Sequence, residues 1–210
     1  MAERAHPKDA EFQDRWVWSR RFKGVIPWPH LLRSTWKQGL IARYRFCQPY
    51  AVGKRVLDVP CGVGWGTSLL RGTGRLVGAD ISEEAIQYAQ THFGDRAEFR
   101  LGDMQHLPFA DASFDLVICV EGIEHVAVNV AEQFIREAVR VLSAAGRIIL
   151  TNPLPDRDRP PNPYHIHEYE LEELETLVEP WFKIELREVR TVGSVRITYF
   201  VGEVHRRTPI

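Results

Sequence analysis

Short apolar runs alternate with amphipathic stretches along the chain after residue 50. The runs lie at 56–59, 75–79, 97–101, 113–120 and 145–153. Their length is typical of strands, and several of the stretches between them carry apolar residues at helical spacing. The run at 113–120 is nearly continuous, which is typical of a central parallel strand covered on both faces. The pattern predicts an α/β fold with a doubly wound, Rossmann-like sheet.

The first fifty residues carry a helical pattern instead. Segments 11–23 and 30–48 place apolar and aromatic residues at helical spacing, so we expect N-terminal cap helices. Four tryptophans fall in or between them: Trp16, Trp18, Trp28 and Trp36. We interpret these as packing the cap on the sheet; the alternative is that one or two wall an acceptor pocket. Arg43 and Tyr44 lie just before the first strand and are candidates to reach a ligand beyond it.

The last thirty residues read as a strand pair. Segments 181–190 and 191–205 alternate between apolar and polar residues around Gly193, which predicts an antiparallel terminal hairpin. Together with the five runs, the hairpin completes a seven-stranded sheet. We expect one domain, with residues 1–50 as its helical cap and residues 51–210 as its α/β part.

Composition and charge narrow the class of protein. The 210 residues are 44% hydrophobic and 26% charged, as in an ordinary globular domain. The net charge of −1 gives no nucleic-acid footprint. No apolar run is long enough to span a bilayer, and the N-terminus lacks the apolar core of a signal peptide. Cys47, Cys61 and Cys119 follow no metal-binding spacing, so we expect buried reduced thiols in a cytoplasmic protein.

A glycine-rich loop follows the first predicted strand and is the main candidate for ligand binding. Gly62, Gly64 and Gly66 alternate there, and glycine lets the backbone turn sharply and approach a ligand closely. An apolar-periodic segment from Thr67 to Leu70 follows the loop and predicts that a helix begins there. A dinucleotide fingerprint requires a third glycine at the position of Thr67. Asp58 ends the strand, and its carboxylate would repel a pyrophosphate but suits an ammonium group. The loop therefore predicts a ligand with an amino-acid end.

This segment resembles motif I of class I S-adenosylmethionine-dependent methyltransferases, D-x-G-x-G-x-G, with Pro60 in place of the first glycine. The resemblance implies S-adenosyl-L-methionine as cofactor, with Asp58, Gly62 and Gly64 as its neighbours. Asp80 ends the second strand, where doubly wound folds hold a ribose, because a carboxylate accepts two hydroxyl hydrogens. The alternative for Asp80 is that it caps the following helix.

The resemblance continues through the next two strands. Ile81 follows Asp80 and is expected to wall the adenine. The segment from Gly102 to Phe109 resembles the family's G-D-x-x-x-L-P-F, which implies that Asp103 meets the adenine amino group and that Met104 forms a wall. Asp103 also fits a plain turn residue. The backbone of Glu121, directly after the fourth strand, is expected near the methionine part of the cofactor.

Acidic and imidazole side chains follow the fourth and fifth strands. Glu121, Glu124 and His125 share one face if they open a helical turn. His165 and His167 point the same way if their segment is extended. The carboxyl ends of parallel strands meet at one edge of the sheet, so two histidines and two carboxylates of this set are expected to converge near the transferred methyl group.

This predicted cluster has three interpretations. In the first, Glu121, Glu124, His125, His165 and His167 hold a divalent cation, Mg²⁺ or Mn²⁺, although the mixed ligands also allow iron or zinc. In the second, His125 or His165 is a general base, with Glu124 beside it. In the third, the histidines make structural hydrogen bonds. A histidine that binds an ion cannot be the base in the same step.

The segments C-G-x-G-x-G, E-x-x-E-H and N-P-[FY]-H-x-x-E-[FY] are similar to those of bacterial methyltransferases associated with polysaccharide biosynthesis. The resemblance implies an O-methyltransferase acting on a sugar hydroxyl of a small-molecule or oligosaccharide acceptor. One alternative is 2′-O-methylation of RNA ends, which the near-neutral charge disfavours. Another is a non-catalytic, cofactor-binding partner subunit. The sequence leaves the oligomeric state open, with a homodimer as one option.

Overall fold

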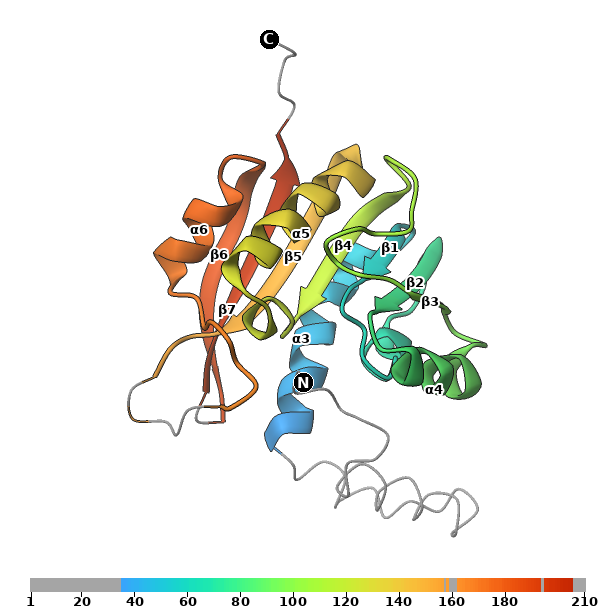
Figure 1. Ribbon diagram of the computed structural model, residues 1–210, viewed down its shortest axis with the longest axis horizontal. Helices are drawn as coiled ribbons and strands as arrows, with labels where there is room; N and C mark the ends of the chain where they lie inside the picture. The colour runs from blue at the N-terminus through green and yellow to red at the C-terminus, as the bar shows by residue number, and fades with distance from the viewer. Residues whose placement is uncertain (1–34, 157, 159–161, 194, 206–210) are drawn as a thin grey trace.

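The computed structural model describes residues 35–156, 158, 162–193 and 195–205. Within these residues, seven strands form a single sheet in the order β3-β2-β1-β4-β5-β7-β6 (Figure 1). The strands are β1 Arg55–Asp58, β2 Arg75–Asp80, β3 Glu98–Leu101, β4 Phe114–Val120, β5 Leu142–Pro153, β6 Phe182–Val192 and β7 Val195–Val204. The predicted cap segment 11–23 and Trp16, Trp18 and Trp28 lie outside the described residues, as does the side chain of Trp36.

The sheet has a parallel part and an antiparallel edge. β1 pairs with β2 and β4 in parallel, β2 with β3, and β4 with β5. β7 then inserts antiparallel between β5 and β6, with Arg147 opposite Glu203 and Pro153 opposite Ile197. The chain crosses from β3 at one edge back to β4 beside β1, and this reversal of the strand order makes the sheet doubly wound. The predicted seven-stranded sheet with an antiparallel terminal hairpin is confirmed.

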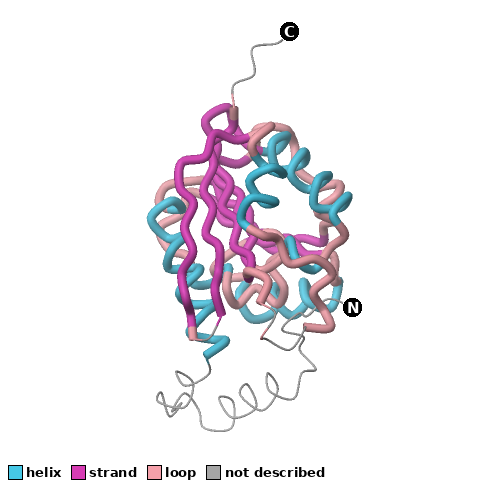
Figure 2. The backbone as a smooth tube through the Cα atoms, turned by 90° about the vertical axis from the view of Figure 1, so that its left-hand side faces the viewer, coloured by secondary structure: helices cyan, strands magenta, loops and turns pink. Residues whose placement is uncertain are grey.

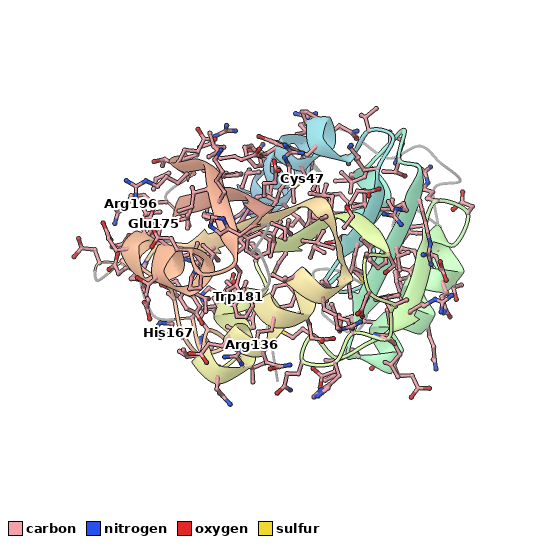
Figure 3. All side chains as sticks on the ribbon, turned by 90° about the horizontal axis from the view of Figure 1, so that it is seen from above. Cys47, Arg136, His167, Glu175, Trp181 and Arg196 are labelled. Carbon is pink, nitrogen blue, oxygen red and sulfur yellow. The ribbon has the colours of Figure 1, made fainter. Side chains whose placement is uncertain are left out.

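Helices cover both faces of this sheet (Figures 1 and 2). They are α3 Thr35–Ala51, α4 Glu83–Phe93, α5 Val128–Val141 and α6 Leu171–Val178, with 3₁₀ turns η1 Thr67–Leu69 and η2 Ile123–His125. α5 and α6 bury Phe134 and Leu174 in one core cluster, and α3 and α4 bury Cys47 and Ala89 in the other. Seen from above, Cys47 lies on one side of the sheet and Arg136 of α5 on the other (Figure 3).

The two-sided cover explains the continuous apolar run of β4. Leu116 and Ile118 point into the cluster under α3 and α4, whereas Val117 and Cys119 point into the cluster under α5. Alternate side chains of one strand thus enter different cores, so every position from Leu116 to Val120 is apolar. The three cysteines are buried and form no disulfide with one another, as expected. None of the described helices is both long and apolar enough to cross a membrane.

The element after the glycine loop differs from the expectation. The sequence suggested that a helix begins at 67–70, but the chain forms only the turn η1, Thr67–Leu69. Thr67 and Ser68 are buried, and the Thr67 hydroxyl donates to Asp58 while the Ser68 hydroxyl donates to the backbone oxygen of Trp65. Side-chain bonds of this kind compete with helix formation. The start of β2 at Arg75 then leaves no room for further helical turns.

We predict that truncating the buried face of α5 is costly. Phe134 is fully buried, so Phe134→Ala should lower the free energy of unfolding by about 3–5 kcal/mol through lost burial and a residual cavity. Arg136, whose side chain is 51% exposed, is the matched control, and Arg136→Ala should change stability by less than about 0.5 kcal/mol. Urea unfolding of both variants measures this, and equal losses would contradict the packing described.

Candidate functional site

The candidate site begins at the end of β1 with a buried carboxyl group. Asp58 is 0% exposed, and its Oδ2 accepts hydrogen bonds from the Tyr44 hydroxyl at 2.9 Å and the Thr67 hydroxyl at 2.5 Å. Its Oδ1 has no hydrogen-bond partner among the described residues. Burial raises the pKa of Asp58 to about 7, although the two hydroxyl donors act to lower it. One oxygen of this carboxyl is therefore left to accept a further donor.

The two loop glycines that the sequence singled out have different surroundings. Both have positive φ, +54° at Gly62 and +76° at Gly64. A Cβ built at Gly64 would lie 2.6 Å from the ring of Phe99, so this glycine is required for packing. A Cβ at Gly62 would meet nothing within 4 Å. Gly62 is thus the loop residue that faces open space, as a ligand cradle requires.

Asp80 ties the glycine loop to the start of α4. Its Oδ2 accepts from the Gly62 N–H at 3.0 Å and its Oδ1 from the Ser82 N–H at 2.9 Å. The N-cap of α4 is Ser82, whose hydroxyl accepts from the Ala85 N–H, so the capping alternative for Asp80 does not describe its main contacts. A ribose bound here would share the Asp80 oxygens with two backbone donors. That role stays a prediction.

The predicted adenine residues surround the ends of β2 and β3. Ile81 is 53% exposed, an unusual state for a large apolar side chain. Asp103 accepts from the Gln105 N–H at 2.8 Å and so forms the turn that the sequence also allowed, while Met104 is buried in the core. Sequence reasoning missed Leu101, which is also 53% exposed and pairs with Asp80 in the sheet register. Its position as the last residue of a strand was the available signal.

The end of β4 is connected to α3. Glu121 has a positive φ of +50°, and its carboxylate accepts from Arg43 Nη2 at 2.9 Å and from the Thr151 hydroxyl at 3.2 Å. The Arg43 residue is only 8% exposed. Arg43 and Tyr44, neighbours on α3, therefore bind the carboxyl groups of Glu121, directly after β4, and of Asp58, at the end of β1. Both carboxyl groups belong to the predicted cofactor site.

Three of the predicted acid and imidazole residues converge. Glu124, His125 and His165 each offer one ligand atom, and these atoms all lie within 4.8 Å of one another. The rings of His125 and His165 meet edge to face, with centroids 5.0 Å apart. Glu124 is 0% exposed, and neither carboxylate oxygen has a hydrogen-bond partner in the described part of the chain. Burial, followed by the charge of Glu121, raises the pKa of Glu124 well above its usual range.

Backbone and side-chain contacts hold this cluster together. The Glu124 backbone oxygen accepts from the N–H groups of Ile166 and His167, at 2.8 and 3.1 Å, which fixes the loop after β5 on η2. His125 Nδ1 lies 3.0 Å from the Tyr164 backbone oxygen. His165 Nδ1 lies 2.5 Å from Glu168 Oε1. Glu168 is a site residue that sequence reasoning did not name.

The other two predicted ligands make separate contacts. His167 Nε2 lies 2.5 Å from Glu173 Oε1, and the ring packs edge to face on Tyr169. Figure 3 shows His167 on the same side of the sheet as Arg136, near the rim of the molecule. The expected i, i+2 alignment of the two histidines needed an extended segment, but the chain turns there, with the His165 N–H donating to the Asn162 oxygen. Glu121 is engaged by α3 and β5.

Residues 57–150 match the model of a family described as a methyltransferase domain. The matched segment is a little under half of the chain. A probable S-adenosylmethionine-dependent methyltransferase of Mycolicibacterium smegmatis is 34% identical over 60% of this chain and 51% of the relative. A fatty-acid O-methyltransferase of the same organism is 38% identical over 51% of this chain and 40% of the relative. The chain spans about half the length of the curated relatives it matches.

Solved structures share the fold of this chain. The PH0226 protein of Pyrococcus horikoshii superposes with a TM-score of 0.66 at 24% identity, over 90% of this chain and 99% of that one. Magnesium protoporphyrin IX methyltransferase of Synechocystis, solved with bound SAH, gives 0.67 at 19% identity, over 95% and 97%. The matched methyltransferase domain contains Asp58, Asp80 and Glu124, whereas Arg43 and His165 lie outside it.

The raised pKa of Asp58 predicts a pH-dependent stability of the ligand-free protein. The folded state keeps a proton that the unfolded chain, with an Asp pKa near about 3.9, releases. The free energy of unfolding should therefore fall as pH rises from about 4 to 7 and level off above that window. Asp58→Asn should reduce this fall by about 2–4 kcal/mol, since each pKa unit is worth about 1.4 kcal/mol. Part of the pH dependence should remain in Asp58→Asn, because burial also raises the pKa of Glu124.

Urea unfolding at several pH values measures this effect. Asp95, whose side chain is 76% exposed, supplies the control substitution Asp95→Asn, which should leave the pH dependence as it is in the wild type. An Asp58→Asn variant with the wild-type pH dependence would show that this carboxyl does not titrate as described.

Proposed function

We propose that this chain is an S-adenosylmethionine-dependent methyltransferase that acts on a hydroxyl group. The observation that carries the proposal is a row of carboxyl groups at the ends of three neighbouring strands. Asp58 ends β1, Asp80 ends β2, and Asp103 follows β3 by two residues. In open α/β sheets this edge is where ligands bind. The match of residues 57–150 to a methyltransferase domain supports the same cofactor.

The residues at this edge fit S-adenosylmethionine. Asp58 Oδ1, which has no partner among the described residues, suits the ammonium group of the amino-acid end. Gly62 has open space where a Cβ would be, so the ligand can approach the backbone. Asp80 is assigned to the ribose, and the half-exposed Ile81 and Leu101 to the faces of the adenine. The bound cofactor supplies an electrophilic methyl group on a positively charged sulfur.

Transfer to a hydroxyl requires removal of a proton, and the cluster of Glu124, His125 and His165 is assigned to that task. The bound cofactor would supply the methyl group to the acceptor oxygen and keep the electrons of its sulfur–carbon bond. His125 or His165 would take the hydroxyl proton as general base, or the cluster would hold a divalent cation that lowers the hydroxyl pKa. Glu121 and Arg43 orient the amino-acid end of the cofactor beside this cluster.

For the acceptor we propose a sugar or a glycosylated molecule. A cation at the cluster would hold two neighbouring hydroxyl oxygens, as a sugar presents them. Two relatives are named for other acceptors: the fatty-acid O-methyltransferase of M. smegmatis and a phthiotriol/phenolphthiotriol dimycocerosates methyltransferase of Mycobacterium ulcerans. An acceptor screen therefore includes sugars, glycolipids, fatty acids and RNA ends.

Cofactor binding is tested by thermal stability. S-adenosylhomocysteine should raise Tm, because a ligand at 100 times its Kd stabilises the folded state by about 2.7 kcal/mol. Ile81→Ala, at an exposed position, should leave Tm without ligand nearly unchanged and reduce the shift, while NAD should give no shift with either protein. A wild-type protein that S-adenosylhomocysteine does not stabilise would contradict the proposed cofactor.

Methyl transfer itself is tested with single variants of three histidines. His125→Ala and His165→Ala should each lower kcat about 10²- to 10⁴-fold, the range for loss of acid–base catalysis. His167→Ala should stay within a few-fold of the wild type, because His167 faces Glu173 instead of the cluster. Wild-type rates in His125→Ala and His165→Ala would show that the hydroxyl is activated elsewhere.

A further inference from the structure

The hydrogen bonds of the cluster assign the proton of each neutral imidazole ring. His125 Nδ1 lies 3.0 Å from the Tyr164 backbone oxygen, which can only accept, so Nδ1 carries the proton. His165 Nδ1 lies 2.5 Å from the Glu168 carboxylate, which gives the same result. In both rings the lone pair is therefore on Nε2. Histidines that bind metals show this arrangement, in which the second ring nitrogen donates to a carbonyl or a carboxylate.

The third member of the cluster supplies an independent observation. Both carboxylate oxygens of Glu124 are buried and have no hydrogen-bond partner among the described residues. Leaving such a group unsatisfied is costly, so a buried carboxylate of this kind usually meets an ion, a water or a ligand. The ligand atoms of Glu124, His125 and His165 lie within 4.8 Å of one another. Ligands about 2.1 Å from one ion lie roughly 3–4 Å apart, so a closure of about one ångström suffices.

We propose that Glu124, His125 and His165 bind a transition-metal ion that accepts imidazole ligands, with Zn²⁺ as the reference ion. Glu168 and the Tyr164 carbonyl orient the two rings as outer partners. The inference deepens the proposed function, because it defines the cation at the acceptor side of the same site. It also revises the expected metal: two imidazoles and one carboxylate suit zinc, iron or cobalt, whereas Mg²⁺ is bound through oxygen ligands and water.

Two consequences follow for the side chains around the ion. Asn162 Nδ2 lies 3.0 Å from His165 Nε2 and would give up this contact when an ion takes the lone pair. Three protein ligands leave coordination positions open for acceptor hydroxyls, whose pKa the ion would lower. Glu168 touches neither acceptor nor ion in this arrangement, so it is a positioning residue that acts through His165.

The site is tested by metal binding to the full chain, independently of methyl transfer. Chelator-treated protein is titrated with Zn²⁺, Co²⁺ and Mg²⁺ by calorimetry, and the visible absorption of bound Co²⁺ reports its coordination. We expect one Zn²⁺ or Co²⁺ per chain at this site and much weaker binding of Mg²⁺. Glu124→Gln and His125→Ala should abolish Zn²⁺ and Co²⁺ binding. Glu168→Gln should weaken this binding about 10- to 100-fold and alter the Co²⁺ spectrum.

The chain contains a matched control for these variants. His167 and Glu173 form a second pair, also at 2.5 Å, in the neighbouring part of the chain but outside the cluster. His167→Ala and Glu173→Gln should bind Zn²⁺ like the wild type. The Tm of each variant, and its shift with S-adenosylhomocysteine, show whether the variant is folded. If Glu124→Gln lowers Tm, Glu168→Gln tests the site instead, because it changes none of the three metal ligands.

Each result distinguishes the two proposals. Absence of Zn²⁺ and Co²⁺ binding, binding that persists in Glu124→Gln and His125→Ala, or tighter binding of Mg²⁺ than of Zn²⁺ would overturn the metal site. If methyl transfer then proceeds in the presence of chelator, the proposed function stands without it. Conversely, Zn²⁺ bound through these residues with no transfer to any acceptor would support the metal site and overturn the proposed function.

Discussion

The main physical constraint on this structure is the burial of two carboxyl groups at the C-terminal edge of its parallel strands. Asp58 and Glu124 are both fully buried, and each has oxygen atoms that no described residue satisfies. Burial of this kind opposes folding unless a proton, an ion or a ligand compensates it. The two core clusters on either side of the sheet supply the stability that tolerates this cost. The proposed ligand site therefore lowers the stability of the ligand-free protein.

Helix α3 completes this edge, although it lies outside the segment that matches the methyltransferase domain. Its neighbouring residues Arg43 and Tyr44 bind Glu121 and Asp58, which end strands β4 and β1. Both contacts are largely buried, so the charge and hydroxyl groups act with little screening by solvent. The position of α3 therefore sets the orientation of two carboxyl groups at once. A change in the docking of α3 would alter the cofactor end of the site first.

The fold was predictable where burial on two faces makes a run of residues apolar, as from Leu116 to Val120 in β4, and where apolar and polar residues alternate, as in the hairpin at Gly193. Local contacts were not predictable. The Thr67 hydroxyl bond to Asp58 replaces a helical turn, and the bend at His165 separates it from His167. Such outcomes depend on individual hydrogen bonds, including those from the Ile166 and His167 N–H groups to the Glu124 backbone oxygen, and periodicity carries no information about them. The role of Glu168 depends on the same bend.

The most direct test of this account is a crystal structure of the protein with S-adenosylhomocysteine. We expect the amino-acid end beside Gly62 and the free oxygen of Asp58, the ribose at Asp80, and the adenine between Ile81 and Leu101. The sulfur should face the Glu124 cluster. Density for the ligand away from the C-terminal edge of the sheet, or a sulfur directed away from Glu124, would contradict the account.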